Sequence, residues 1–464
     1  MSKQKHKLTP KDYLSISANY LCLFFFSSNE ALPHINSFYL KNYISPSCSY
    51  NTIFYISIAL TNFSSFMKFF GLSFVNIYPH KQLISFSYLF ILLSSILLVL
   101  LPYFGYALFF LSIYSLGSSF CYFLIINSLW KIFPFHKGTI LGMAAGVTGI
   151  GTLSWRALFD FLNHDIKKYY LILVTMTIVF FFISIVSIKI EEVKTVDTSN
   201  IKCENLELSK SINESDDYEN ELSESGKDSS SESITRGPIS RSKHRIKSYF
   251  RKVSKSIFTK KFSYILIAYI LVSSGLYSIS SSYLSYGIIN KIPYIPYTNC
   301  FYLLFLSLFS IFWGVLHDLR GFRQWIVVIA IIQLLSYIAL FFSNSFKWMI
   351  LVSGLINSIS FSGVNSLFFP MTSKEIGGDC AIDVVAIMGF IGENVKLSIS
   401  ILMKYLCWNN AGFIGVYFFS AGFIIISVVM VYKLIFPDNS KDKNNVFTKK
   451  IWIEQDKLRD LRKE

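Results

Sequence analysis

Charged residues inside long apolar segments are the first candidates for chemistry in this sequence. A charge within a lipid bilayer is costly, so it is kept mainly where it binds a solute, carries a proton or pairs with another charge. Glu30 and Arg156 each lie about 17 to 18 residues into an apolar segment, so at 1.5 Å per residue both would reach nearly one depth. They form a candidate charge pair if their two segments are neighbours.

A second candidate cluster holds Glu393, Asn394 and Lys396 within one apolar segment. Lys396 falls near the middle of the segment, where a fixed cation could bind a carboxylate substrate. Glu393 lies on the same helical face three residues earlier, so it could also neutralise the lysine internally. His34 and Asn357 are weaker substrate-binding candidates, because lone polar residues in such segments are more often satisfied structural groups.

No other pattern in the sequence predicts catalysis. There is no phosphate-binding loop of Walker type, no metal-ligand spacing and no defensible Ser-His-Asp arrangement. The seven cysteines are scattered and form no disulfide framework. We therefore expect a protein that is not an enzyme, holds no cofactor or metal, and does not use ATP.

The composition is that of a multi-pass membrane protein. Of 464 residues, 53% are hydrophobic and 15% are charged, and the mean hydropathy is +0.47. A soluble protein would carry about a quarter charged residues. The net charge of +15 does not indicate a nucleic-acid partner, because the basic residues lie at the ends of apolar segments and in the tails.

The apolar segments predict twelve transmembrane helices, since about 20 residues cross a bilayer. Six precede a polar linker and six follow it. The predicted spans are 13–36, 51–71, 82–102, 104–128, 138–161, 169–189, 262–290, 297–315, 325–343, 347–369, 380–404 and 411–435. Lysine and arginine are concentrated in the loops on the N-terminal side, in the linker and in the C-terminal tail, which predicts that both termini and the linker are cytoplasmic.

The linker, residues 191–258, has two parts of opposite charge. Thirteen acids lie between Glu191 and Glu232 among many serines, a composition typical of disorder. Ten lysines and arginines and no acid lie between Arg236 and Lys261. Apolar residues from Ile246 to Phe258 recur at helical spacing, which predicts an amphipathic helix on an anionic lipid surface, although a solvated basic linker is the plainer alternative.

The two groups of spans share landmarks that indicate duplicated halves. Phe69-Phe70-Gly71 ends the second span and Phe312-Trp313-Gly314 ends the eighth. Phe133-Pro134 follows the fourth span and Phe369-Pro370 follows the tenth. The sequence thus divides into an N-terminal six-helix bundle (1–190), the linker (191–258), a C-terminal six-helix bundle (259–436) and a tail (437–464). Two halves that rock around a central site are what a transporter requires.

Two stretches resemble the major facilitator superfamily. The loop GVLHDLRGFRQ after the eighth span is similar to its cytoplasmic signature and supplies the candidate gating residues, which are Gly314, Asp318, Arg320, Gly321 and Arg323. The stretch from Trp130 to Gly151 resembles the entry to the fifth span in oxalate–formate antiporters and monocarboxylate transporters.

This resemblance implies an all-α membrane protein of twelve helices in two pseudo-symmetric bundles. In that layout the first and fifth helices are neighbours, which implies a Glu30–Arg156 ion pair, either a partner-exchanging site or a permanent structural pair, with Asp160 as an alternative partner. The oxalate–formate relatives bind substrate through a lysine in the helix that holds Lys396. They also carry a substrate-binding arginine in the eighth span, where 297–315 has no basic residue.

We therefore expect a monomeric secondary transporter of a small organic anion, with possible proton coupling and with anionic lipid at the basic linker. The alternatives are a carrier of amino acids or other small polar metabolites, and a membrane sensor that binds without transporting.

Overall fold

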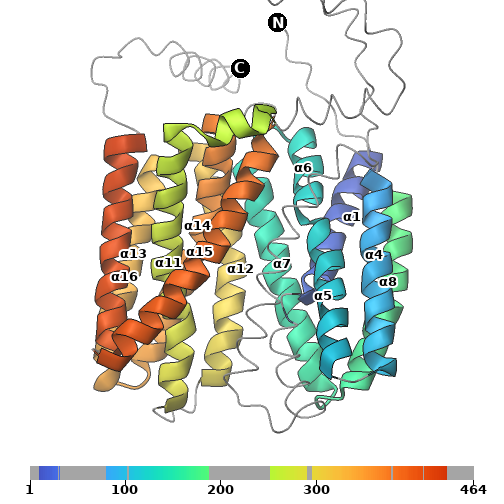
Figure 1. Cartoon of the computed structure of the whole chain (residues 1–464), viewed down its shortest axis with the longest axis horizontal. Coiled ribbons are helices and arrows are strands. Elements are labelled where there is room, and N and C mark those ends of the chain that lie inside the picture. Colours follow the sequence, from blue (N-terminus) through green and yellow to red (C-terminus); the bar gives the residue numbers. More distant parts are fainter. Residues whose placement is uncertain are drawn as a thin grey trace, which may run out of the picture.

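The computed structural model of the chain describes residues 10–29, 31, 80–101, 104–187, 251–289, 295–377, 380–410 and 412–435. This part of the chain is helical throughout, as the sequence predicts. The helices stand side by side in one bundle, and the N-terminal half (α1 to α8) lies beside the C-terminal half (α11 to α16) (Figure 1).

The helix bounds follow the apolar segments closely. In the N-terminal half they are α1 (Pro10–Phe26), α4 (His80–Leu100), α5 (Phe104–Phe120), α6 (Tyr122–Ile132), α7 (Lys137–Phe161) and α8 (Ile166–Ser187). In the C-terminal half they are α11 (Lys260–Ile289), α12 (Ile295–Arg320), α13 (Arg323–Phe341), α14 (Met349–Thr372), α15 (Ala381–Asn410) and α16 (Gly412–Met430). Short helices η3 (Phe342–Asn344), η4 (Ser373–Gly377) and η6 (Val431–Ile435) follow α13, α14 and α16.

Several bounds differ from the predictions for physical reasons. The span predicted at 104–128 is two consecutive helices, α5 and α6, joined at Cys121. Helix α12 runs to Arg320, beyond the predicted 315, and ends where Gly321 adopts a φ of 80° and donates its N–H to the His317 carbonyl. The predicted span 51–71 lies outside the described residues.

The two Phe-Pro landmarks do not behave alike. Pro134 follows the end of α6 at Ile132, as predicted. Pro370 lies inside α14, which continues to Thr372 and then into the π-helix η4, so the prediction that it follows its span is wrong. Pro370 has no N–H to donate to the carbonyl four residues earlier, yet α14 continues past it to Thr372.

Length and composition make the bundle a membrane domain. Among the described residues, seven helices are long and apolar enough to cross a bilayer, or up to eight if a bent pair formed by Arg251–Ile257 and Lys260–Tyr277 is one span. Exposed large apolar side chains cover the outer faces of α4, α8 and α16, where lipid replaces water as the surrounding solvent.

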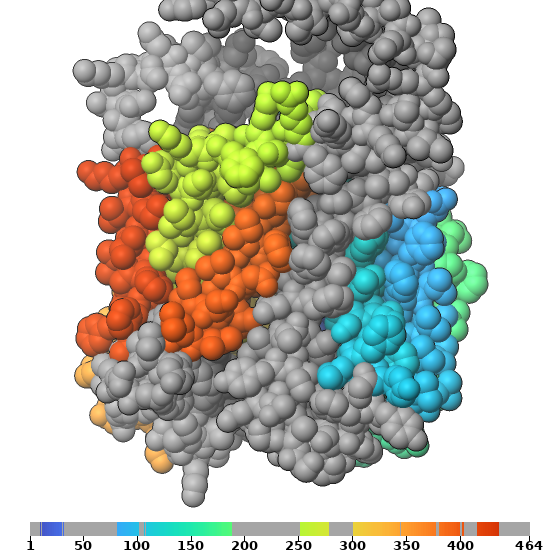
Figure 2. All heavy atoms as spheres, in the orientation of Figure 1, coloured from blue at the N-terminus to red at the C-terminus, as the bar shows by residue number. Residues whose placement is uncertain are grey.

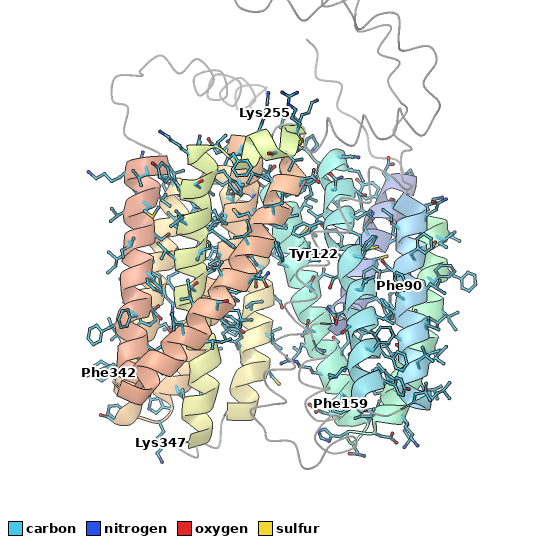
Figure 3. All side chains as sticks on the ribbon, viewed as in Figure 1. Phe90, Tyr122, Phe159, Lys255, Phe342 and Lys347 are labelled. Atoms are coloured by element: carbon cyan, nitrogen blue, oxygen red, sulfur yellow. The ribbon has the colours of Figure 1, made fainter. Side chains whose placement is uncertain are left out.

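We call the two ends of the bundle the Asp318 end and the Trp348 end. The Asp318 end holds the turn between α6 and α7 and the end of α12; the Trp348 end holds the turn between α7 and α8 and the connection from α13 to α14. In Figure 3, Lys255 is labelled at the Asp318 end and Lys347 at the Trp348 end.

At the Trp348 end, the N–H of Lys168 donates to Asp165 at 3.2 Å and lowers the pKa of that exposed carboxyl.

Residues 188–250, which include most of the linker, lie outside the described residues, and so do residues 436–464, which include the tail. The described end of the linker, Arg251–Ile257, is helical and bends by 66° from α11. Its Val253 is buried, whereas Arg251, Lys252 and Lys255 are exposed. One side of this short segment is therefore buried and the other exposed, and the amphipathic helix predicted from Ile246 to Phe258 stays a prediction.

Candidate functional site

Lys396 lies on α15 with its side chain almost fully buried, at 6% exposed. Its ammonium pairs with the Glu393 carboxylate one turn earlier on the same helix. The ammonium also lies 4.9 Å from the centre of the Tyr277 ring and 5.6 Å from that of Phe361, close enough for cation–π attraction. Three helices, α11, α14 and α15, thus surround one buried cation.

Glu393 is the more accessible member of the pair, with a side chain 32% exposed. Its second carboxylate oxygen lies 3.3 Å from the Tyr269 hydroxyl, which also lies 2.9 Å from the amide oxygen of Asn365. A phenol has one proton, so Tyr269 can donate to only one of these two acceptors at a time. The charge on Glu393 therefore affects which hydrogen bond Tyr269 makes.

The position of Tyr269 depends on a glycine. A Cβ added to Gly392 would come 2.1 Å from the Tyr269 ring, nearer than van der Waals contact allows. Tyr269 is fully buried and its ring also packs against Phe368 and Phe369, with ring centroids 5.6 Å away in both cases. We name Glu393, Lys396, Tyr269 and Asn365 the α15 cluster.

Two of the other predicted binding residues, Asn394 and Asn357, make their hydrogen bonds outside the α15 cluster. The Asn394 side chain donates to the carbonyl of Phe390 at 2.7 Å, a bond within its own helix. Asn357 is fully buried on α14 and accepts a hydrogen bond from Gln333 of α13 at 2.9 Å, which favours a structural role. Arg156 lies in the last third of α7. Glu30 and His34 lie outside the described residues, so the Glu30–Arg156 pair stays a prediction.

A second polar constellation joins the two halves at the Asp318 end. One oxygen of Asp318 accepts the N–H of Gly138 at 2.9 Å, and the other accepts the N–H of Thr139 at 2.6 Å and its hydroxyl at 2.7 Å. The first backbone N–H groups of a helix have no partner within it, and the helix dipole favours a negative charge there. Asp318 at the end of α12 thereby caps α7; we name this the Asp318 contact.

Two further contacts surround the Asp318 contact. The ammonium of Lys137 donates to the hydroxyl of Ser373 in η4 at 2.8 Å and lies 5.2 Å from the centre of the Trp130 ring. Lys261, at the start of α11, pairs with Glu375 in η4 at 2.5 Å. The short helix η4 therefore contacts both α7 and α11.

Glycines allow α7 and α12 to approach closely beyond the Asp318 contact. A Cβ at Gly138 or Gly142 would come 2.7 Å or less from a carbonyl oxygen of α12, and one at Gly149 would come 2.1 Å from the Ser307 hydroxyl. On the facing side, a Cβ at Gly314 would come 2.3 Å from the Gly138 carbonyl. The predicted gating residue Gly314 thus lies in the contact between the two halves.

The remaining predicted gating residues lie near the Asp318 contact, and their described interactions stay within the C-terminal half. Gly321 ends α12, and Arg320 is exposed beside it. Arg323 begins α13, and its guanidinium lies 4.5 Å from the centre of the Tyr432 ring, while the Tyr432 hydroxyl donates to the Arg323 carbonyl at 3.2 Å. Arg323 therefore joins α13 to η6 within the C-terminal half.

Two helical bundles that meet closely along α7 and α12 can be compared with known families. Residues 16–395 match the family model of the Major Facilitator Superfamily. The chain belongs to this superfamily. It is therefore a multi-pass membrane transporter and not an enzyme, and the twelve-helix architecture fits its helices.

A solved structure of a superfamily member supports the same fold. The proton:xylose symporter XylE, bound to 6-bromo-6-deoxy-D-glucose, matches with a TM-score of 0.62 at 10% identity, over 91% of this chain and 95% of that chain. No curated protein sequence matches the chain. At this identity the likeness to XylE concerns the fold alone.

Five residues of these two sites have no clear signal in the sequence: Tyr269, Asn365, Thr139, Ser373 and Glu375. Tyr269 and Asn365 are polar residues inside predicted spans, a signal weaker than the charge of Lys396. Thr139 acts mainly through its backbone N–H, which no side-chain pattern reveals. Ser373 and Glu375 lie in the π-helix that the predicted span 347–369 leaves out.

Proposed function

We propose that the chain is a secondary transporter of a small organic solute that carries a carboxylate, and that it binds this solute at the α15 cluster. The observation that carries the proposal is the buried ammonium of Lys396 beside the one-third exposed carboxylate of Glu393. The resemblance of the Trp130–Gly151 stretch to oxalate–formate and monocarboxylate transporters supports an organic anion as substrate.

A carboxylate that enters the membrane loses most of its water, and a fixed cation can compensate for that loss. Lys396 supplies the cation, and the rings of Tyr277 and Phe361 hold its ammonium in place. A simple monocarboxylate must then displace Glu393 from Lys396. Protonation of Glu393 would release the lysine, so we expect uptake of a monocarboxylate to increase as the pH falls.

An amino acid is the second candidate, and the exposure of Glu393 favours it. A zwitterion offers its ammonium to Glu393 and its carboxylate to Lys396, so both charges of the pair stay compensated. The Tyr269 hydroxyl and the Asn365 amide could then accept or donate further hydrogen bonds. Uptake of an amino acid by this route requires no protonation of Glu393.

We further propose that the Asp318 contact closes one end of the transporter in its alternating cycle. Its carboxylate holds two backbone N–H groups of the opposite half, and α7 and α12 meet on glycines along the adjoining turns. Movement between the halves must break these hydrogen bonds each time this end opens. The positive-inside prediction puts this end in the cytoplasm.

Uptake into proteoliposomes tests the proposal. The purified full chain is reconstituted, and a panel of radiolabelled monocarboxylates, dicarboxylates, amino acids and sugars is offered at an acidic and at a neutral pH, because protonation of Glu393 should increase the uptake of a monocarboxylate. We expect accumulation of a carboxylate-bearing solute above that in protein-free vesicles. Uptake of sugars alone would overturn the proposed substrate class, and binding without accumulation would indicate a sensor.

A further inference from the structure

The segment that enters α11 at the Asp318 end carries an exposed basic surface. Arg251, Lys252 and Lys255 are exposed, and Lys260 is exposed at the first position of α11. In Figure 2 the yellow-green atoms of this segment form part of the molecular surface at that end. No acidic residue interrupts the segment from Arg251 to Lys261.

An aromatic side chain lies within this basic surface. Phe258 is 87% exposed, between Lys255 and Lys260, at the bend where α11 begins. Val253 in the same segment is 6% exposed, and Ile257 packs against the hydrophobic core of the bundle. An exposed aromatic ring flanked by lysines, at the level where a span begins, suits the boundary between headgroups and acyl chains.

We propose that the basic surface, formed by Arg251, Lys252, Lys255, Phe258 and Lys260, binds anionic phospholipid headgroups of the adjoining leaflet and thereby stabilises the Asp318 contact. Each lysine or arginine near an anionic bilayer strengthens such binding by about fivefold. The exposed ring of Phe258 favours a bilayer over a soluble anion, because only a bilayer offers an apolar layer beside its charges.

A short series of contacts connects this surface to the Asp318 contact. Lys261 directly follows Lys260 and pairs with Glu375 of η4 at 2.5 Å. In the same short helix, Ser373 accepts a hydrogen bond from Lys137 at 2.8 Å. Lys137 precedes Gly138, the first of the two residues whose N–H groups Asp318 accepts. A lipid that fixes the basic surface therefore restrains the first turn of α7 through η4.

Amide hydrogen exchange measures this effect without any substrate, so its result is independent of the proposed function. The full chain is placed in nanodiscs of neutral phosphatidylcholine, or of the same lipid with one third phosphatidylserine. We expect the amides of Gly138 and Thr139 to exchange about tenfold more slowly with the anionic lipid, because charge attraction fixes the linker segment. Exchange in α4, which packs against α5 and α8, serves as the internal reference.

Three variants separate lipid binding at the basic surface from its effect on the Asp318 contact through η4. Replacing Arg251, Lys252 and Lys255 together by Gln should remove the lipid dependence. The matched control replaces three lysines at the Trp348 end, Lys167, Lys168 and Lys347, and should keep it. Lys261→Met should keep lipid-dependent protection of residues 251–257 and lose the lipid-dependent protection of Gly138 and Thr139.

Each other outcome contradicts a stated part of the proposal. Equal exchange in neutral and anionic nanodiscs would overturn the lipid site. Slow exchange in neutral nanodiscs after addition of inorganic phosphate or inositol hexaphosphate would show that a soluble anion, and not the bilayer, is the occupant. A Lys261→Met protein whose Gly138 and Thr139 still respond to anionic lipid would overturn the route through η4.

Discussion

Tyr269 is the residue whose role depends most on tertiary structure. Its hydroxyl lies within hydrogen-bond distance of both Asn365 and Glu393, on two different helices. Tyr269→Phe keeps the ring that packs against Gly392 and Phe368, and removes only the hydroxyl. We expect substrate affinity to fall by about two- to twelvefold, since one hydrogen bond contributes about 0.5–1.5 kcal/mol.

Tyr337→Phe is the matched control, because Tyr337 is also buried and lies on α13, away from the α15 cluster. Equilibrium binding by calorimetry and thermal unfolding are measured on both variants. A Tyr269→Phe protein that binds substrate like the wild type would remove Tyr269 from the site.

At this scale, residue spacing by itself predicts contacts within one helix, whereas the Glu30–Arg156 pair between helices rests on the family resemblance and stays a prediction. The pairing of Glu393 with Lys396 follows from their spacing of three residues on one helical face, and it is present in the structure. The contact of Tyr269 with Glu393 joins residues 124 positions apart, so no local pattern encodes it. The structural partner of Asn357, Gln333 of α13, was missed for the same reason.

The Asp318 contact depends on two helices and leads to a prediction about their separation. Asp318→Asn replaces an acceptor oxygen by an NH2 group that faces backbone N–H donors, and it removes the attraction to the α7 dipole. Charge-assisted hydrogen bonds contribute about 1.5–3 kcal/mol, so the closed state of this end should lose most of that stabilisation.

We therefore expect Asp318→Asn to slow transport while equilibrium affinity stays within about threefold, under 1 kcal/mol. Turnover in proteoliposomes and binding in detergent are the two measurements. Lost binding with a normal exchange rate would contradict a gating role and place Asp318 in the binding site.

The glycines of α7 give a second prediction for the same pair of helices. A Cβ at Gly142 would come 2.4 Å from the Ser310 carbonyl, whereas one at Gly422 of α16 would meet no atom within 4 Å. Gly142→Ala should separate α7 from α12 at a cost of about 1–3 kcal/mol, as overpacking does. Gly422→Ala should leave both transport and thermal stability unchanged, and equal effects of the two variants would contradict the close-approach role.

Hydropathy predicts most helices to within a few residues, but not where polar contacts extend a helix. The predicted 138–161 and the observed Lys137–Phe161 nearly coincide, because apolar residues and glycines fill that helix. Helix α12 runs five residues further than predicted, since His317, Asp318 and Arg320 continue it. The bonds of Asp318 to α7 lie in that added turn, and apolar content alone does not predict it.

For the whole molecule, the twelve-span layout follows from hydropathy and charge, and membership of the Major Facilitator Superfamily supports it. The orientation of the chain in the membrane rests on the distribution of lysine and arginine and stays a prediction.

Protease added outside sealed, right-side-out cells should leave the linker 191–258 intact, and protease added after permeabilisation should cut it. Cleavage from the outside of sealed cells would invert the topology.

The central claim is that Lys396 binds the carboxylate of the substrate. Lys396→Gln removes the charge, keeps hydrogen-bond donors and leaves Glu393 without its lysine. A loss of function by this variant alone therefore has two explanations: the substrate has lost its cation, or the lone charge of Glu393 destabilises the protein. The double variant Glu393→Gln with Lys396→Gln replaces both charges by neutral amides of similar length, which removes the cost of a lone buried charge.

Equilibrium binding of the transported solute to the double variant, after thermal unfolding has shown that it is folded, is the most direct test. If Lys396 binds the carboxylate, the double variant should stay folded and lose roughly 2–5 kcal/mol of binding free energy. If the pair is only structural, the double variant should fold and transport better than Lys396→Gln. Full binding and transport by the double variant would contradict the claim.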